Sequence, residues 1–218
     1  WTFEPNYAVT LRECPYKLMA EKKPGLLANT HAPLVLPVDQ HFNVKGIGLV
    51  AIGYVQAGSV NVHDELMLLP ARGPGTAKSL QVMDDDVPVA SAGDRVGLAL
   101  RNAKEEHLTG STIIVHPAVE DKQTGITPPL AIEQHITSRV HLKTSPFQKR
   151  VLAEGDVVHA SVDLQFVVGR VTQAEGEQIT VKWESPLFIR TTDPPSILLA
   201  QLDSRPRIMG SARAERQD

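Results

Sequence analysis

Two closely spaced glycines are the residues of this chain best suited to binding chemistry. Gly46 and Gly48 flank one residue in the stretch Phe42-Asn-Val-Lys-Gly-Ile-Gly-Leu49. Glycine adopts positive φ without steric cost and carries no side chain. The stretch therefore allows either a sharp turn between two strands or the close approach of a partner's backbone. From the residues alone, the structural hairpin is the favoured interpretation.

A basic stretch in the second half is another candidate binding surface. Residues 134–153 contain no Asp or Glu, and their basic side chains are His135, Arg139, His141, Lys143, Lys149 and Arg150. Local positive charge contacts phosphates with a salt-dependent contribution, and the interleaved Phe147 can stack on a base. The alternative is an ordinary solvated basic face, because the net charge of −3 gives phosphate binding no support.

No constellation for catalysis is present in the sequence. A P-loop needs Gly-x-x-x-x-Gly-Lys-Ser/Thr to cradle phosphates, and the dipeptide Gly-Lys does not occur. Asp94-Arg-Val-Gly97 matches only a bare Asp-x-x-Gly, and neither Gly-x-Ser-x-Gly nor His-Glu-x-x-His is found. The three acids Asp84–Asp86 are expected to form a solvated turn. We therefore expect no enzyme activity, no metal and no cofactor in this chain.

Composition and charge exclude several further classes. A net charge of −3 argues against a DNA-coating protein, and no apolar stretch approaches the roughly 20 residues that span a bilayer. The single cysteine, Cys14, cannot form an internal disulfide, which fits a reduced, cytoplasmic protein. A chain that opens at Trp1 suggests an excised or processed product with a domain upstream.

Short β-rich runs separated by turn residues predict an all-β fold of two tandem β-barrels. We expect a linker or the tail of an upstream domain over residues 1–33, a first barrel over 34–117 and a second over 128–213. The strands expected in the first barrel are 34–42, 49–55, 66–69, 77–83, 96–100 and 112–116. Those expected in the second are 130–142, 157–162, 165–172, 178–183, 197–202 and 207–212.

A turn device recurs in both halves. Asp64, Asp94 and Asp156 each precede a strand, and Asp94 and Asp156 come directly after a glycine. Glycine supplies positive φ at a turn, and we expect the aspartate to accept hydrogen bonds from backbone amides just beyond it. Any β protein needs such turns, so they support the architecture rather than an active site.

The glycine run and a second motif about forty residues later resemble a known family. Within the run Val38 to Gly58, the segment that begins at Phe42 is similar to the pattern Phe-x-Ile-x-Gly-x-Gly-Thr-Val-x-x-Gly, and Ala92-Gly-Asp94 with Gly97 comes next in the same order. This resembles domain 2 of translational GTPases, with elongation factor Tu, elongation factor one alpha and SelB as the nearest branches. The runs 197–203 and 207–210 resemble the closing strands of domain 3, another β-barrel.

The resemblance implies a partner and a set of site residues. In such factors domain 2 lies against the GTPase domain and receives the aminoacylated 3′ end of tRNA, while domain 3 helps hold the T-arm. The positions implied for the aminoacyl end are Asp39, Gln40, Phe42, Gly46, Gly48 and Arg95. For the tRNA backbone we expect Arg139, Lys143, Phe147, Lys149 and Arg150. GTP and Mg²⁺ would bind only to an upstream G domain acting in cis.

Three departures from the family pattern indicate a divergent, SelB-like paralogue. Gln40 stands where the selenocysteine-specific branch usually has histidine, which weakens a cationic pocket for a selenolate. Leu49 replaces threonine and is expected to alter hydrogen bonding beside the pocket, and His63-Asp64 replaces Gly-Asp. The expected function is binding of aminoacyl-tRNA or the ribosome in protein synthesis. The alternative is a protein-interaction or regulatory scaffold that keeps the barrels but has lost tRNA binding.

Overall fold

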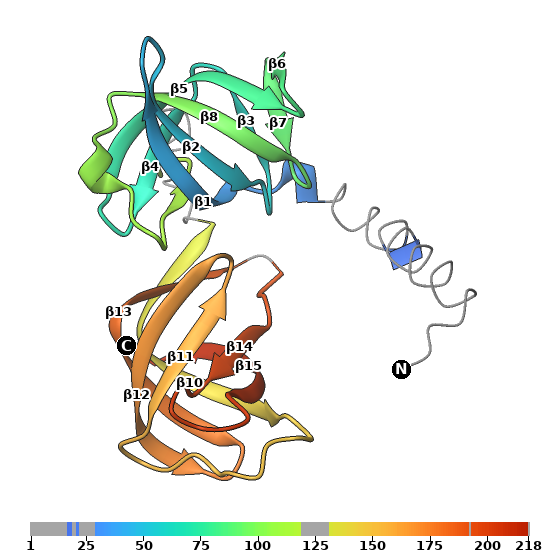
Figure 1. Cartoon of the computed structure of the whole chain (residues 1–218), viewed down its shortest axis with the longest axis vertical. Helices are drawn as coiled ribbons and strands as arrows, with labels where there is room; N and C mark the ends of the chain where they lie inside the picture. The colour runs from blue at the N-terminus through green and yellow to red at the C-terminus, as the bar shows by residue number, and fades with distance from the viewer. Residues whose placement is uncertain (1–16, 19–20, 22–28, 119–130, 192, 218) are drawn as a thin grey trace, which may run out of the picture.

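Runs of Val, Leu and Ile, which favour extended backbone, build this chain almost entirely from strands. The computed structural model describes residues 17–18, 21, 29–118, 131–191 and 193–217. Two β-barrels lie one above the other along the long axis (Figure 1), which confirms the all-β tandem architecture expected from the sequence.

The segment expected to be a linker or tail, residues 1–33, lies mostly outside the described residues. Within it, the structure describes residues 17–18 and 21 and the stretch from Asn29 onward, where the 3₁₀ turn η1 (Asn29–His31) packs on the first barrel. The backbone N–H of Gly58 donates to the carbonyl of Asn29 at 2.8 Å, which fixes this entry to the barrel.

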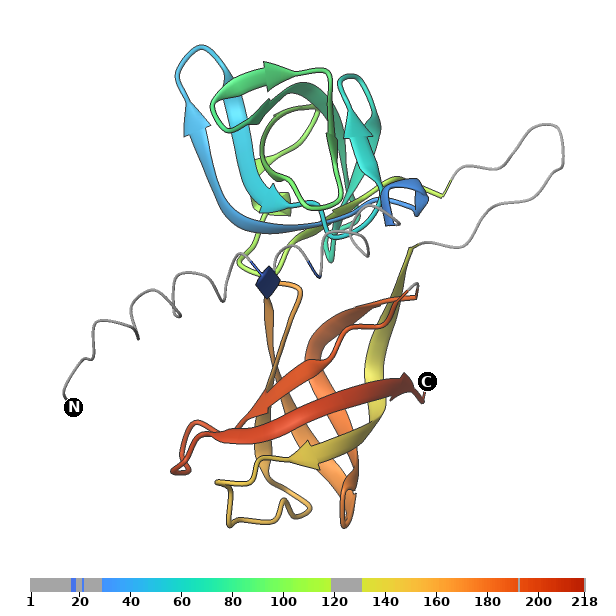
Figure 2. The ribbon, with the colours of Figure 1, turned by 90° about the vertical axis from the view of Figure 1, so that its right-hand side faces the viewer.

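The first barrel is a closed ring of antiparallel strands. Along the chain, it contains β1 (Val35–Val44), β2 (Gly48–Tyr54), β3 (Ser59–Asn61), β4 (Glu65–Leu69), β5 (Gly73–Val82), β6 (Asp85–Val87), β7 (Val89–Ser91), β8 (Arg95–Arg101), the 3₁₀ turn η2 (Glu105–His107) and β9 (Ile113–Val115). The sheet order is β4-β9-β1-β2-β8-β5-β6, the pairing of β4 with β5 closes the ring, and β3 and β7 pair with each other as a separate two-stranded sheet. Figure 2 shows these strands curving around a common interior.

The second barrel is also closed and is built from longer strands. They are β10 (Ile132–Thr144), β11 (Val157–Val162), β12 (Gln165–Glu175), β13 (Gln178–Arg190), β14 (Ile197–Ala200) and β15 (Ile208–Arg216), in the ring order β10-β13-β12-β11-β14-β15. Because β10 pairs with β15, the first and last strands of this barrel are neighbours.

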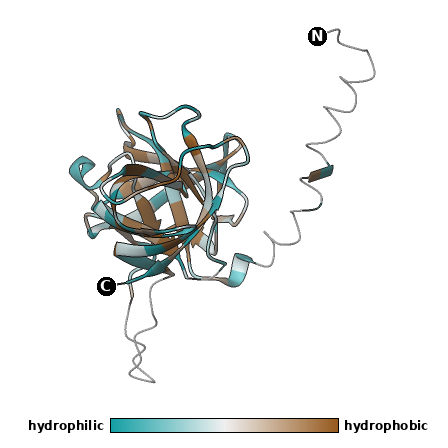
Figure 3. Ribbon diagram, turned by 90° about the horizontal axis from the view of Figure 1, so that it is seen from below, coloured by the Kyte–Doolittle hydropathy of each residue, from teal (hydrophilic) through white to brown (hydrophobic). Residues whose placement is uncertain are grey.

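Each barrel has its own hydrophobic core, and a third cluster joins them. Apolar residues gather around the barrel interiors and polar ones on the loops (Figure 3). The third cluster combines Val35, Leu69 and Ile113 of the first barrel with Ile132 and Phe188 of the second. The backbone N–H of Phe166 also donates to Ser111 Oγ at 3.3 Å. The barrels therefore share a buried apolar interface.

The three recurring aspartate turns are built alike, although not quite as expected. The carboxylate oxygens of Asp64, Asp94 and Asp156 accept from the backbone N–H of the residue three positions earlier, at 2.7, 2.8 and 2.9 Å. The residue before each aspartate has positive φ, as the third position of a type II turn requires. The expected bonds to amides beyond the aspartate are replaced by bonds to amides before it, which close the turn.

Some strands differ from those expected from the sequence. Of the three acids expected to form a turn, Asp84 lies in the turn with a φ of +69°, whereas Asp85 and Asp86 lie in β6. Strand β13 continues past the expected end at Trp183 through Pro186 to Arg190. In the ladder of β10 and β13, residues 183–186 lie between the paired positions Lys182 and Leu187, so the missing N–H of Pro186 breaks no bond with β10.

Candidate functional site

The outer face of the first barrel gathers several of the residues predicted to bind an aminoacyl end. Residues directly opposite in an antiparallel pair share a face. One row of such partners crosses four strands as Gln40, Ile52, Gly97 and Gln81. The neighbouring row contains Phe42, Val50 and Ala99. The face thus has a polar residue at either side and a glycine, without a side chain, near its centre.

Gly97 keeps the middle of this face open. A Cβ added at Gly97 would meet only Gln81, at 3.9 Å, so packing does not explain the glycine. Its φ is also not positive, so the backbone does not require glycine there. The absent side chain leaves room above β8 for a ligand between Ile52 and Gln81.

Arg95 lies at one end of the same face and is held by an aromatic ring. It is the cross-strand partner of Tyr54, and its guanidinium carbon lies 5.9 Å from the centre of the Tyr54 ring. A cation over the face of an aromatic ring is attracted by the ring quadrupole. Tyr54 therefore positions the guanidinium at the edge of the Gln40 to Gln81 row.

Asp39 owes its position to a β-bulge. The register of β1 against β2 shifts between Val38 and Gln40, so Asp39 is the extra, exposed residue. Across the bulge, a Cβ at Gly53 would overlap the Pro37 carbonyl oxygen, and this close approach explains why glycine stands there. Asp39 and Arg95 stand two strands apart, roughly 10 Å by strand spacing.

The hairpin glycines do not join this cluster. Gly46 and Gly48 lie at the β1–β2 turn with φ of +86° and +106°, so the backbone requires them. Tyr54, the partner of Arg95, is six residues along β2 from Gly48, or about 20 Å by the rise of a strand. No described atom would lie within 4 Å of a Cβ at either glycine, so the tip is open to a partner of its own.

Leu49 does not border the outer face. It is 6% exposed and packs in the core of the first barrel, on the opposite side of β2 from Val50. Leu49 therefore does not alter hydrogen bonding beside the pocket, contrary to what was expected from the sequence. A leucine here adds apolar contact inside the barrel.

The face is completed by Tyr54, Ile52 and Gln81, which were not predicted from the sequence. The signal was present, because Val50, Ile52 and Tyr54 alternate along β2 with the buried Leu49 and Ala51. The sequence did not indicate which strand lies next to β2 in the sheet. The partner is β8, about forty residues away along the chain, and short-range spacing does not predict such a pairing.

The predicted tRNA-backbone residues of the second barrel are spread over a strand and a loop, and acids surround several of them. Arg139 lies on β10 opposite Glu215 of β15, and it lines a polar hollow of about 260 Å³ that also contains Glu175. In the amide orientation that satisfies both ends, Gln217 Oε1 accepts from Arg139 Nη2 at 3.0 Å. His141 Nε2 lies 3.7 Å from Glu215 Oε1.

In the loop after β10, Arg150 Nη2 pairs with Asp156 Oδ1 at 2.6 Å. Lys143 and Lys149 are exposed, and Phe147 is 78% exposed. The acid-free stretch in the sequence is therefore partly neutralised by acids from other segments. Lys143, Phe147 and Lys149 retain the most exposed basic and aromatic character.

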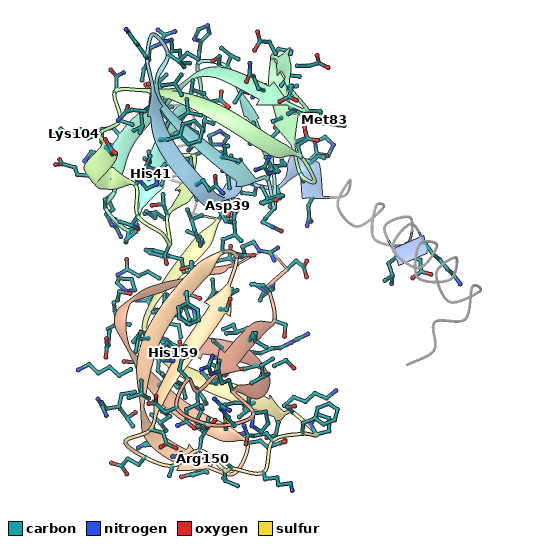
Figure 4. All side chains as sticks on the ribbon, viewed as in Figure 1. Asp39, His41, Met83, Lys104, Arg150 and His159 are labelled. Atoms are coloured by element: carbon teal, nitrogen blue, oxygen red, sulfur yellow. The ribbon has the colours of Figure 1, made fainter. Side chains whose placement is uncertain are left out.

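Gln148 ties this loop to the neighbouring loop between β14 and β15. Its Nε2 donates to the Pro206 carbonyl at 2.8 Å, and its Oε1 accepts from the backbone N–H groups of Lys149 and Arg150 at 3.0 and 2.9 Å. Figure 4 places Asp39 beside the junction of the barrels and Arg150 at the far end of the second barrel. The two predicted surfaces are thus separate sites, one on the first barrel near the junction and one at the far end of the second barrel.

No helix in the part of the chain that the structure describes is long and apolar enough to cross a membrane.

Comparison with known proteins identifies the first barrel. Residues 48–114 match the family model of elongation factor Tu domain 2. This range includes Gly48, Ile52, Tyr54, Arg95 and Gly97, and so most of the outer face described above.

The relatives of this chain include elongation factors of archaea. The selenocysteine-specific elongation factor of Methanocaldococcus jannaschii is 30% identical over 72% of this chain and 31% of its own length. Elongation factor 1-alpha of Methanosarcina barkeri is 28% identical over 63% of this chain and 33% of its own. An uncharacterized protein of M. jannaschii is 27% identical over 80% of this chain and 52% of its own. The chain spans about half or less of each of these relatives.

Solved structures show the same tandem barrels. The apo form of the translation elongation factor SelB from Methanococcus maripaludis superposes with a TM-score of 0.72 at 23% identity, over 87% of this chain and 43% of SelB. A bacterial selenocysteine-specific elongation factor gives 0.68 at 20% identity, over 90% of this chain and 31% of its own. By the family model over residues 48–114 and by its archaeal relatives, the chain is a pair of barrels of the elongation factor Tu, elongation factor 1-alpha and SelB superfamily, with the first barrel matching domain 2 and both barrels sharing the fold seen in SelB.

Proposed function

We propose that these barrels are the non-catalytic region of a GTP-binding translation factor of the cytoplasm, and that they bind aminoacyl-tRNA, the ribosome or both. GTP and Mg²⁺ would bind to a G domain upstream in the same protein, because the P-loop that cradles phosphates has no counterpart in this sequence. The proposal assigns this chain to binding and positioning, and assigns any hydrolysis to the G domain.

The observation that carries the proposal is the outer face of β1, β2 and β8. Gln40, Phe42 and Arg95 lie on it together, and Gly97 leaves its centre open. Phe42 and Tyr54 are 41% and 38% exposed, so the face presents two aromatic side chains to solvent. Aromatic surface beside a guanidinium suits a terminal adenosine with its attached amino acid, through stacking and contact with phosphate.

The second barrel would contribute the salt-dependent part of the affinity. Lys143, Lys149 and Phe147 are exposed and lie away from the outer face of the first barrel, as a long ligand such as tRNA would require. Each phosphate contact that displaces a counterion steepens the dependence of affinity on salt.

Gly97→Val tests the aminoacyl site. A Cβ at Gly97 meets only Gln81, and valine favours strands, so the barrel should keep its stability while the face is filled. We expect the wild-type chain to slow hydrolysis of the aminoacyl ester of a charged tRNA and the variant to lose about tenfold in affinity. Thr172→Val on β12 is the control, because it places a valine at an exposed strand position of the second barrel.

Arg95→Ala provides a second test at the same face. Removing the guanidinium should reduce the preference for charged over uncharged tRNA while leaving the fold unchanged, because Arg95 is exposed. Binding is measured at about 50 mM and about 200 mM salt, where phosphate contacts weaken strongly. Equal affinity of the wild-type chain for both tRNA forms would overturn the aminoacyl assignment.

One observation favours a second function, that of a protein-interaction scaffold. Met83 is 90% exposed at the tip of the β5–β6 hairpin, next to Asp84, Asp85 and Asp86. An acidic tip with an exposed apolar side chain repels RNA and suits a basic protein surface. Reversing the charge of both Lys143 and Lys149 to Glu separates the two functions: tRNA or ribosome association should collapse under the first and stay unchanged under the second.

A further inference from the structure

A hollow between the barrels has the composition of a small-ligand site and lies apart from both surfaces proposed above. Its volume is about 290 Å³, and its apolar floor is formed by Leu69 of the first barrel with Ile132 and Phe188 of the second. These three residues belong to the buried cluster that joins the barrels. Ligand sites occur preferentially at domain interfaces, and a volume near 300 Å³ suits a fragment-sized molecule.

The rim of the hollow carries two guanidinium groups, one from each barrel. Arg72 comes from the β4–β5 turn and Arg216 from the end of β15. Arg72 Nη2 donates to Gln134 Oε1 at a long 3.4 Å, and Arg216 Nη1 lies 3.7 Å from Glu133 Oε1. With Glu133 as the acid of this rim, the charge of the hollow is positive by one.

The backbone conformation of Arg72 is a second indication that its side chain has a role at this hollow. Its φ is +55°, a left-handed conformation that glycine adopts at no steric cost and other residues adopt with strain. The turn alone would favour glycine, yet the chain has arginine there. Its side chain reaches across to Gln134 of the other barrel, so the position serves the space between the barrels.

We propose that this hollow binds a small organic anion, whose carboxylate or phosphate is held by Arg72 and Arg216 and whose apolar body lies on Leu69, Ile132 and Phe188. Guanidinium groups bind either anion through charge-assisted, bidentate hydrogen bonds. Both barrels supply part of the site, so the ligand favours the state in which they are docked. The proposal is independent of tRNA binding.

The test uses the full chain and four probes. Phenylacetate and phenyl phosphate combine an anion with an apolar ring, phenylacetamide keeps the ring without the charge, and acetate keeps the charge without the ring. Binding is followed by the methyl resonances of Leu69 and Ile132. We expect at least one of the two aromatic anions to bind about tenfold more tightly than the amide and than acetate. The tighter of the two identifies the anion class.

Arg72→Gly is the discriminating variant, because glycine suits the turn and the protein should fold at least as well. It should weaken the preferred anion about tenfold. Lys104→Ala is the control, since it removes one positive charge from an exposed site elsewhere on the first barrel. Equal binding of amide and anion, unchanged affinity in Arg72→Gly, or no shift at Leu69 and Ile132 up to about 10 mM of either anion would each overturn the proposal.

Discussion

At the scale of single residues, Asp64 shows how one carboxylate can stabilise a turn and respond to pH. Burial by itself raises the pKa of Asp64, but hydrogen bonds from the backbone and side chain of Asn61 and from His116 outweigh it and hold the pKa below 3.8. His116 Nε2 lies 3.1 Å from Asp64 Oδ2. A histidine just after the last strand of the barrel thereby fastens a turn that precedes β4.

This arrangement predicts a pH-dependent stability. Because the folded-state pKa of Asp64 is depressed, its contribution is fully present above the ordinary aspartate pKa and is lost as pH falls through the folded value. The wild type should exceed Asp64→Asn by roughly 1–2 kcal/mol near neutral pH, and the difference should vanish in acid. Carboxyl-carbon NMR titration gives the pKa directly, and His116→Ala should return part of the shift. A pKa of Asp64 at its ordinary value would contradict this account.

A matched pair of glycines tests the bulge in β1. In Gly53→Ala the new Cβ overlaps the Pro37 carbonyl and Leu36, whereas in Gly97→Ala it makes only ordinary contact with Gln81. Gly53→Ala should therefore lower the free energy of unfolding by about 3 kcal/mol, and Gly97→Ala should change it little. Chemical denaturation measures both, and equal losses would mean that the bulge has relaxed around the added methyl group.

The candidate site could be predicted from single residues only in part. Phe42, Gln40 and Arg95 were recognisable by their resemblance to a family pattern, and the structure brings them to one face. Gly46 and Gly48 belong to the same pattern but lie at the turn where β2 begins, far from Arg95. Each residue of a strand adds about 3.3 Å to its length, so residues that are close in sequence can lie far apart. The pairing of Arg150 with Asp156 also depends on a turn geometry that composition does not specify.

At the scale of elements, the side chain of Gln148 links the loop after β10 to the loop between β14 and β15. Gln148 bonds to two amides of its own loop and to the carbonyl of Pro206 in the next. Gln148→Ala should leave global stability nearly unchanged and speed amide hydrogen exchange at Lys149 and Arg150 about tenfold or more, since both lose their acceptor. Gln173→Ala on β12 serves as the control. Unchanged exchange at both amides would show that the loop is ordered by other contacts.

Long alternating strands were predictable from the sequence, and most of the three-residue strands were not. The alternation of buried and exposed residues in β11 gave its bounds, Val157–Val162, without error. Strands β3, β6 and β7 have three residues each, too few for a period of two to be recognised. The extension of β13 past Trp183 was hidden by Pro186, which is tolerated where the ladder with β10 is interrupted.

At the scale of the whole molecule, the shared cluster between the barrels predicts cooperative unfolding. Phe188 is 3% exposed, and its backbone is clamped by Gln165, which donates to its carbonyl at 2.7 Å and accepts from its N–H at 2.9 Å. Phe188→Ala should cost about 3–5 kcal/mol and split one thermal transition into two, because the barrels lose common apolar surface. Differential calorimetry resolves this, with Phe166→Ala, an exposed aromatic, as the control. A single transition in Phe188→Ala would show that the contact between the barrels does not depend on this side chain.

The tandem architecture was predictable, but the interface between the barrels was not. Two sets of alternating strands separated by a polar, proline-containing segment predicted two barrels. Ile132 and Phe188 are as apolar as the residues of the cores, and nothing in the alternation indicates that they face another barrel rather than their own. Such assignments depend on the end of a strand, where the inside and the outside of a barrel meet.

The pairing of β10 with β15 has a consequence for how the chain folds as it is synthesised. The pairing of β10, the first strand of the second barrel, is complete only after the last strand, Ile208–Arg216, has been synthesised. Until then β10 and β14 each present an unpaired edge, which is where strands of other chains can add. The first barrel is already closed by β9 at Val115, about a hundred residues earlier. During synthesis, the second barrel is thus the part of this protein most exposed to misassembly, and loss of the final strand would leave it permanently open.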